Sequence, residues 1–158
     1  MDGEIQAISG QLQRILNAVC ASLDGLSDAQ LNWRLPISGG NSIYAIAAHT
    51  LGNARGWVLG IACGQPVERD RPAEFRASGP DAGALQADAA SLAKEIDAAL
   101  SALSPSDLDR RVMPLAKYWG DGNPHEISVR EALLHVVEHA ALHLGQIQIT
   151  RDLALRES

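Results

Sequence analysis

Residues 128–148 read SVREALLHVVEHAALHLGQIQ, and this stretch decides the fold. Ser128 and Glu131 are three residues apart, the spacing of a capping box at the start of a helix. Apolar residues then recur at helical spacing, at Leu133, Val136, Val137, Ala140, Leu144, Ile147 and Thr150. We therefore expect a helix over 128–153 that buries one face against other helices.

The same periodicity predicts three more long helices upstream, over 4–24, 43–63 and 85–103. Aromatic residues make up only 4% of the chain, and alanine and leucine supply most of its apolar content, which favours helix packing over sheets. Four helices of roughly 20 residues, each about 30 Å long, indicate an all-α fold, a four-helix bundle with long loops.

The connections between these helices differ in length. Ser27 and Gln30 have the spacing of a second capping box, which predicts a short helical turn through Trp33. The polar segments 64–79 and 104–127 are predicted to be long loops, and loops of this length are often functional. In the second loop, Tyr118 and Trp119 either form a wall of a pocket or contribute to a dimer surface.

Length and charge limit the classes of function. With 158 residues the chain is expected to form a single domain over 1–158. Its formal net charge is −6 and it has no basic stripe, so we expect no nucleic-acid partner. It also lacks an apolar leader and a long uncharged run, so we expect no membrane association. With two widely separated cysteines, Cys20 and Cys63, the expected location is the cytoplasm.

Three histidines in the predicted last helix point to chemistry. His135, His139 and His143 are each four residues apart, so successive side chains drift only about 40° around the helix axis. One ion cannot bind all three, because His135 and His143 are about 12 Å apart along the axis. The ion therefore binds either His135 with His139 or His139 with His143. A third ligand must come from another helix, where His49 is the remaining helical histidine.

Two segments carry a resemblance to a known family. The stretch LSDAQLNWRLPISGGNSIYAIAAHTLGN (26–53), followed by SVREALLHVVEHAALHLGQIQ, resembles the DinB-like superfamily over most of the chain. The specific features are the Asn-Ser before a helix with one histidine and the Glu-His-x-x-x-His-x-Gly-Gln-Ile of the last helix. Many relatives carry arginine where Leu144 stands here, so the role of that arginine is not transferred.

The resemblance implies a metal centre and a set of possible reactions. Members are four-helix bundles, often homodimers, that bind a divalent ion through residues equivalent to His49, His139 and His143. His135 then lies beside the ligands or in the core. Some members transfer low-molecular-weight thiols to electrophilic substrates, and others are called hydrolases. Imidazole ligands suit zinc or nickel, and also iron or copper.

The carboxylates near the predicted ligands distinguish only weakly between these reactions. A hydrolase usually needs a carboxylate base beside the ion, and neither Glu131 nor Glu138 is placed to reach it. A thiol needs no separate base, because a metal converts a bound thiol to its thiolate. We therefore favour a thiol transferase over a hydrolase, with a non-catalytic stress-response module that binds metal as the competing hypothesis.

Six further residues are candidates for a role at the site or in packing. Asn53 and Gln146 are one turn from His49 and His143, so each either contacts a ligand or bridges helices. Trp57 is expected to pack in the core, and His125 to be exposed. Gly56 and Gly60 are expected to permit a close helix approach.

Overall fold

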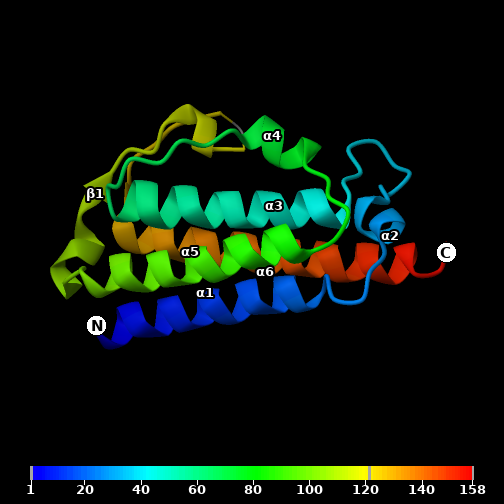
Figure 1. Ribbon diagram of the computed structural model, residues 1–158. Helices are drawn as coiled ribbons and strands as arrows, with labels where there is room; N and C mark the ends of the chain where they lie inside the picture. The colour runs from blue at the N-terminus through cyan, green and yellow to red at the C-terminus, as the bar shows by residue number, and fades with distance from the viewer. Residues whose placement is uncertain (1, 121, 158) are drawn as a thin grey trace.

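The computed structural model describes residues 2–120 and 122–157, in which four long helical segments pack side by side (Figure 1). They are α1 (Gly3–Ala21), α3 (Ile43–Ala54) continued by the π-helix η1 (Arg55–Ala62), α5 (Gly83–Ser101) and α6 (Val129–Ala154). The predicted all-α four-helix bundle is confirmed.

Capping boxes fix the starts of two helices where the sequence predicted them. At the start of α6, the Ser128 hydroxyl accepts from the Glu131 backbone N–H, and the Glu131 carboxylate accepts from the Ser128 N–H. Ser27 and Gln30 make the same pair of bonds at the start of the short helix α2 (Asp28–Asn32). Each cap satisfies backbone N–H groups that the first helical turn leaves without partners.

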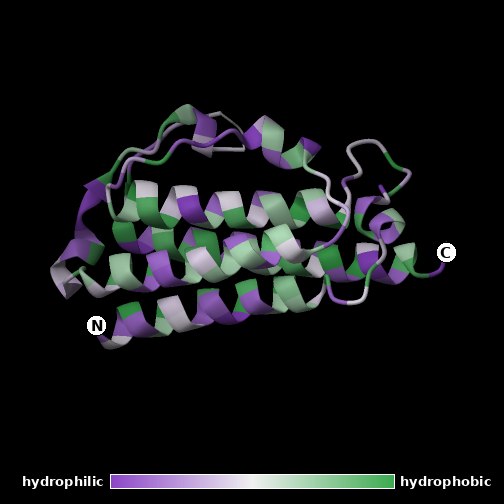
Figure 2. Ribbon diagram, viewed as in Figure 1, coloured by the Kyte–Doolittle hydropathy of each residue, from purple (hydrophilic) through white to green (hydrophobic). Residues whose placement is uncertain are grey.

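The core lies along the axis of the bundle, where every long helix contributes large side chains. Trp57, Leu12, Leu92 and Leu133 are all completely buried, and they come from η1, α1, α5 and α6. Figure 2 shows hydrophobic and hydrophilic residues alternating along each ribbon, as amphipathic helices require. Burying each such side chain contributes about 1.5–3 kcal/mol, which holds the helices in register.

Side-chain contacts give the directions of the helices. Arg130 near the start of α6 pairs with Glu4 near the start of α1, so these two helices run the same way. α3 runs against α6, because His49 contacts His139 whereas Trp57, further along the chain, contacts His135. Figure 1 shows that α3 and α5 also run in the same direction. A connection from the end of η1 back along the bundle is therefore required, and residues 63–82 provide it.

This crossover contains a helix that the sequence analysis did not predict. α4 (Arg71–Arg76) lies within the segment 64–79, and packs against α3. Asp70 caps it by accepting from the Ala73 N–H, and Pro72 stands in its first turn. The prediction of a loop throughout 64–79 is therefore wrong for these residues, because six residues are too few to show a helical period.

The second long connection also has structure of its own. Its elements are two short 3₁₀ helices and two two-residue strands, η2 (Pro105–Asp109), β1 (Arg111–Val112), η3 (Ala116–Tyr118) and β2 (Ile127–Ser128). The strands pair antiparallel, which brings the ends of the connection together. Among the described residues, none of the helices combines the length and the apolar character needed to cross a membrane.

Candidate metal centre

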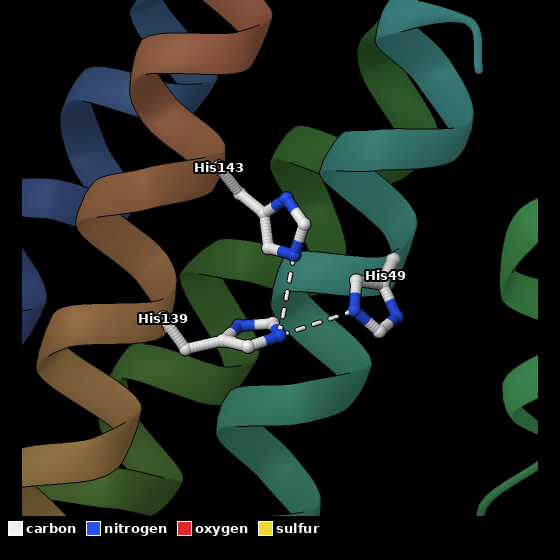
Figure 3. A group of neighbouring side chains, drawn as sticks. All are labelled: His49, His139 and His143. Carbon is white, nitrogen blue, oxygen red and sulfur yellow. Dashed lines mark hydrogen bonds between the residues drawn. The ribbon is translucent and has the colours of Figure 1, made fainter. Parts of the chain in front are cut away.

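Three imidazoles meet between α3 and α6 (Figure 3). The Nε2 atom of His139 lies 3.2 Å from Nε2 of His49 and 3.2 Å from Nε2 of His143. One nitrogen from each of the three residues lies within 4.8 Å of the others. The structure therefore brings together the three histidines that the family resemblance implied, from two separate helices.

Hydrogen bonds on the outer side of two rings fix which nitrogen carries the proton. The Glu74 carboxylate accepts from Nδ1–H of His49 at 2.8 Å, and the Gln146 side-chain oxygen accepts from Nδ1–H of His143 at 2.6 Å. A neutral imidazole protonated at Nδ1 carries a lone pair at Nε2. The lone pairs of His49 and His143 therefore both point toward His139.

This arrangement fits a cation better than hydrogen bonds alone. Nε2–H of His139 can donate to one of its two neighbours but not to both, so one close nitrogen pair is left without a proton between its lone pairs. A divalent ion satisfies all three lone pairs at once. Metal–nitrogen bonds of about 2.0–2.1 Å in a tetrahedral site place ligand nitrogens about 3.3 Å apart, close to the two separations of 3.2 Å.

The surroundings keep His139 and His143 neutral, as metal ligands must be. Burial lowers the pKa of His139 to about 2, and the neighbouring His143, His49, His135 and Arg69 add to the effect. Burial is also the main cause that lowers the pKa of His143, against the hydrogen bond that His143 donates to Gln146, which acts in the opposite direction. A neutral imidazole is available to a metal without first losing a proton.

Two charged residues of the crossover support His49, and the sequence analysis missed both. Arg69 donates to Glu74 through two nitrogens, at 2.8 and 2.9 Å, in a bidentate ion pair. Burial alone would raise the pKa of Glu74, but the hydrogen bonds from His49 and Arg69 outweigh burial and lower it. The ionised carboxylate therefore orients the His49 ring and increases the basicity of Nε2.

Two glycines, one on α3 and one on η1, leave room for this ion pair. A Cβ at Gly52 would collide with the Glu74 carboxylate, and one at Gly56 would lie 2.8 Å from the Tyr118 ring and 3.2 Å from the Arg69 side chain. The expected close approach at Gly56 therefore occurs, but to side chains of the two long connections rather than to another helix.

Phe75 covers the same histidine. Its ring stacks on the ring of His49, with centroids 4.2 Å apart and planes 26° apart. α4 thus supplies both a carboxylate and an aromatic cover to His49. The start signals of this helix, Asp70 and Pro72, are visible in the sequence, but its packing against α3 is a long-range contact that no local pattern encodes.

His135 lies next to the triad but outside it. Its ring centroid is 5.8 Å from that of His139 and 4.2 Å from that of the completely buried Trp57. Burial lowers the pKa of His135, so it is a neutral packing partner for Trp57. Tyr118 and Trp119 both pack edge-on against Trp57, so the second long connection closes this end of the α3–α6 interface.

Gln146 and Asn53, the two polar residues that lie one turn from a histidine, have different contacts in the structure. Gln146 binds His143, as one of the two interpretations expected. Asn53 is 3% exposed, and within the described part of the chain its side-chain oxygen has no hydrogen-bond partner; the same is true of Nδ1 of His139. His125 is exposed, as predicted, and stacks on Trp119.

Comparisons with known proteins identify the family and agree with the fold. The sequence model of the DinB superfamily matches residues 11–147. A crystal structure of a conserved protein from Enterococcus faecalis is similar in fold, with a TM-score of 0.69 and 18% sequence identity over 98% of each chain. No curated protein matches the sequence.

Replacing His139 with alanine is expected to abolish metal binding, because its Nε2 atom lies 3.2 Å from Nε2 of each of the other two histidines. Wild-type protein reconstituted with zinc or nickel should retain one ion per chain after desalting, measured by elemental analysis. His125→Ala is the control, because it removes an exposed imidazole from a neighbouring loop. Equal metal content in His139→Ala and wild type would refute the assignment.

Replacing Glu74 with glutamine is expected to weaken metal binding about 10–100-fold, the usual effect of losing a hydrogen-bonded partner of a ligand. The neutral amide neither increases the basicity of His49 nor pairs with Arg69, although it occupies the same volume. Competition with a chromophoric chelator measures the affinity. Glu68→Gln, an exposed change in the same crossover, is the control, and an equal loss in both variants would contradict the role of Glu74.

Proposed function

The chain belongs to the DinB superfamily, and we propose that it is a cytoplasmic, metal-dependent transferase that acts with a low-molecular-weight thiol on an electrophilic substrate. The observation that carries this proposal is the convergence of three imidazole nitrogens from two helices. Three protein ligands leave a coordination position for an incoming molecule, as in catalytic rather than structural sites. The two unpaired cysteines, Cys20 and Cys63, suit a reducing compartment.

We propose that His49, His139 and His143 bind one divalent ion, with zinc or nickel favoured and iron or copper also suited to imidazole ligands. When bound, such an ion supplies Lewis acidity that lowers the pKa of a coordinated thiol and makes it nucleophilic at neutral pH. The protein's own contribution is to orient the His49 and His143 rings through Glu74 and Gln146.

The carboxylates near the site favour thiol transfer over hydrolysis. Glu74 binds the outer edge of His49, away from Nε2, and Arg69 occupies both of its oxygens. Glu131 caps the start of α6, and Glu138 is exposed. None of these groups is a free base beside the three Nε2 atoms, and a water nucleophile usually needs one. A thiol does not, because its proton dissociates to solvent on binding.

The proposed reaction conserves atoms and charge. The thiol proton passes to solvent, and a sulfur lone pair forms a bond to the electrophilic carbon. With an epoxide substrate, the carbon–oxygen bond breaks at the same time, and the released oxygen takes a proton from solvent. The neutral imidazoles take up no proton in this sequence, which agrees with the low pKa of His139.

Turnover with a thiol is the direct test. Protein loaded with zinc or nickel is incubated with a small thiol and an epoxide, and loss of free thiol is followed with a thiol-reactive dye. Consumption should require the metal and should fall to the uncatalysed rate in His49→Ala. A tightly bound ion with no turnover across several thiols would contradict the transferase and support the non-catalytic module. Ester hydrolysis without thiol would instead support a hydrolase.

We also propose that the protein is a homodimer through the outer face of α6. Leu134, Leu142 and Ile149 are 52%, 64% and 64% exposed, and their spacing puts them on one side of the helix. Light scattering after gel filtration should give twice the chain mass, and Leu142→Glu should give a monomer. Leu115→Glu, an equally exposed change on the loop, should leave the dimer intact. A monomeric wild type would contradict the proposal.

A further inference from the structure

A cationic pocket lies where α4 meets the second long connection. Its volume is about 400 Å³, and it is lined by Arg69, Asp70, Arg71, Pro72, Lys117 and Trp119. Three of the six lining residues are cations and one, Asp70, is an anion that caps α4, so the lining has an excess of positive charge on a chain whose net charge is −6. A local concentration of positive charge on an acidic protein indicates an anionic ligand.

Two of these cations are available to a ligand. Among the described residues, Arg71 and Lys117 have no carboxylate partner, whereas Arg69 pairs with Glu74. Each free cation is held over an aromatic ring: the Arg71 guanidinium carbon is 5.1 Å from the centroid of Phe75, and Lys117 Nζ is 5.6 Å from that of Tyr118. Cation–π contacts orient a charged group without neutralising it, so both charges remain able to bind an anion.

The pocket adjoins residues that contact His49, and none of the three histidines lines it. Arg69 lines the pocket and places its Nη2 atom 3.5 Å from Nδ1 of His49. Phe75 has Arg71 over its ring and also stacks on His49. Phe75 therefore contacts both a cation of the pocket and one of the three histidines.

A second pocket, next to the triad, differs from the first in the charge of its lining. It adjoins Gln146, the partner of His143, and is lined by Leu35, Ile37, Gly39, Gly40, Asn41, Ile46, Gln146, Ile149 and Thr150. None of these side chains is charged. Between these two pockets, the one at α4 offers cations to an anionic group and the other offers none.

We propose that the α4 pocket binds carboxylate groups of the small thiol whose sulfur is held at the imidazoles. This inference rests on the proposed function, because it places the charged end of the thiol beside α4 while its sulfur lies at His49, His139 and His143. Arg71 and Lys117 are the anion-binding residues, and Arg69 is retained by Glu74 as part of the support for His49.

The test is calorimetric binding of matched probes to zinc-loaded and zinc-free protein. Mercaptosuccinate carries a thiol and two carboxylates, its dimethyl ester keeps only the thiol, and succinate keeps only the carboxylates. Mercaptosuccinate should bind zinc-loaded protein more tightly than either of the others. The double variant Arg71→Gln/Lys117→Gln should weaken mercaptosuccinate and succinate about tenfold or more and leave the ester unchanged. Lys94→Gln, an exposed change on α5, is the matched control.

The outcomes separate this inference from the proposed function. Equal binding of mercaptosuccinate and its ester, or an equal loss in Lys94→Gln, would overturn the anion site while leaving thiol binding at the metal intact. If zinc strengthens succinate binding as much as mercaptosuccinate binding, the assignment of the carboxylates to the thiol is overturned. If zinc strengthens the binding of neither mercaptosuccinate nor its ester, the thiol function itself fails, whatever the variants do.

Discussion

The convergence of three imidazole nitrogens at the α3–α6 interface is the constraint on which the candidate site depends. Nε2 of His139 lies 3.2 Å from each of two nitrogens whose lone pairs face it. Burial keeps His139 neutral, and its single Nε2 proton cannot satisfy both close pairs. The packing of α3 against α6 stabilises the protein through its apolar contacts, and the triad is the polar arrangement that a cation would complete.

The topology of the bundle supplies the support that orients these rings. Because α3 and α5 run in the same direction, the chain must return along the bundle between them, and that crossover passes over α3. Its residues Arg69, Glu74 and Phe75 all contact or support His49. Gly52 and Gly56 leave the space that these side chains occupy. The long connection is therefore part of the site rather than a passive link.

The sequence predicted the four long helices well, because periodicity and capping boxes are local signals and the apolar faces agree with them. The helical spacing also predicted that His135, His139 and His143 share a face and that an ion would bind His139 with one of the other two. The choice of His143 over His135 did not follow from spacing, since both are four residues from His139. In the structure, Trp57 packs against His135, whereas His49 meets His143 and His139. Glu74 was missed because its partner is 25 residues away and its helix is only six residues long.

X-ray absorption at the metal edge of reconstituted protein would report whether the three histidines share one ion. The spectrum reports the number and type of ligand atoms around the ion, and imidazole rings give a characteristic outer-shell scattering. The account predicts three imidazole nitrogens at about 2.0–2.1 Å for a zinc-loaded sample, reduced to two in His49→Gln. A spectrum without imidazole scattering, or one unchanged by that substitution, would contradict a metal centre shared by α3 and α6.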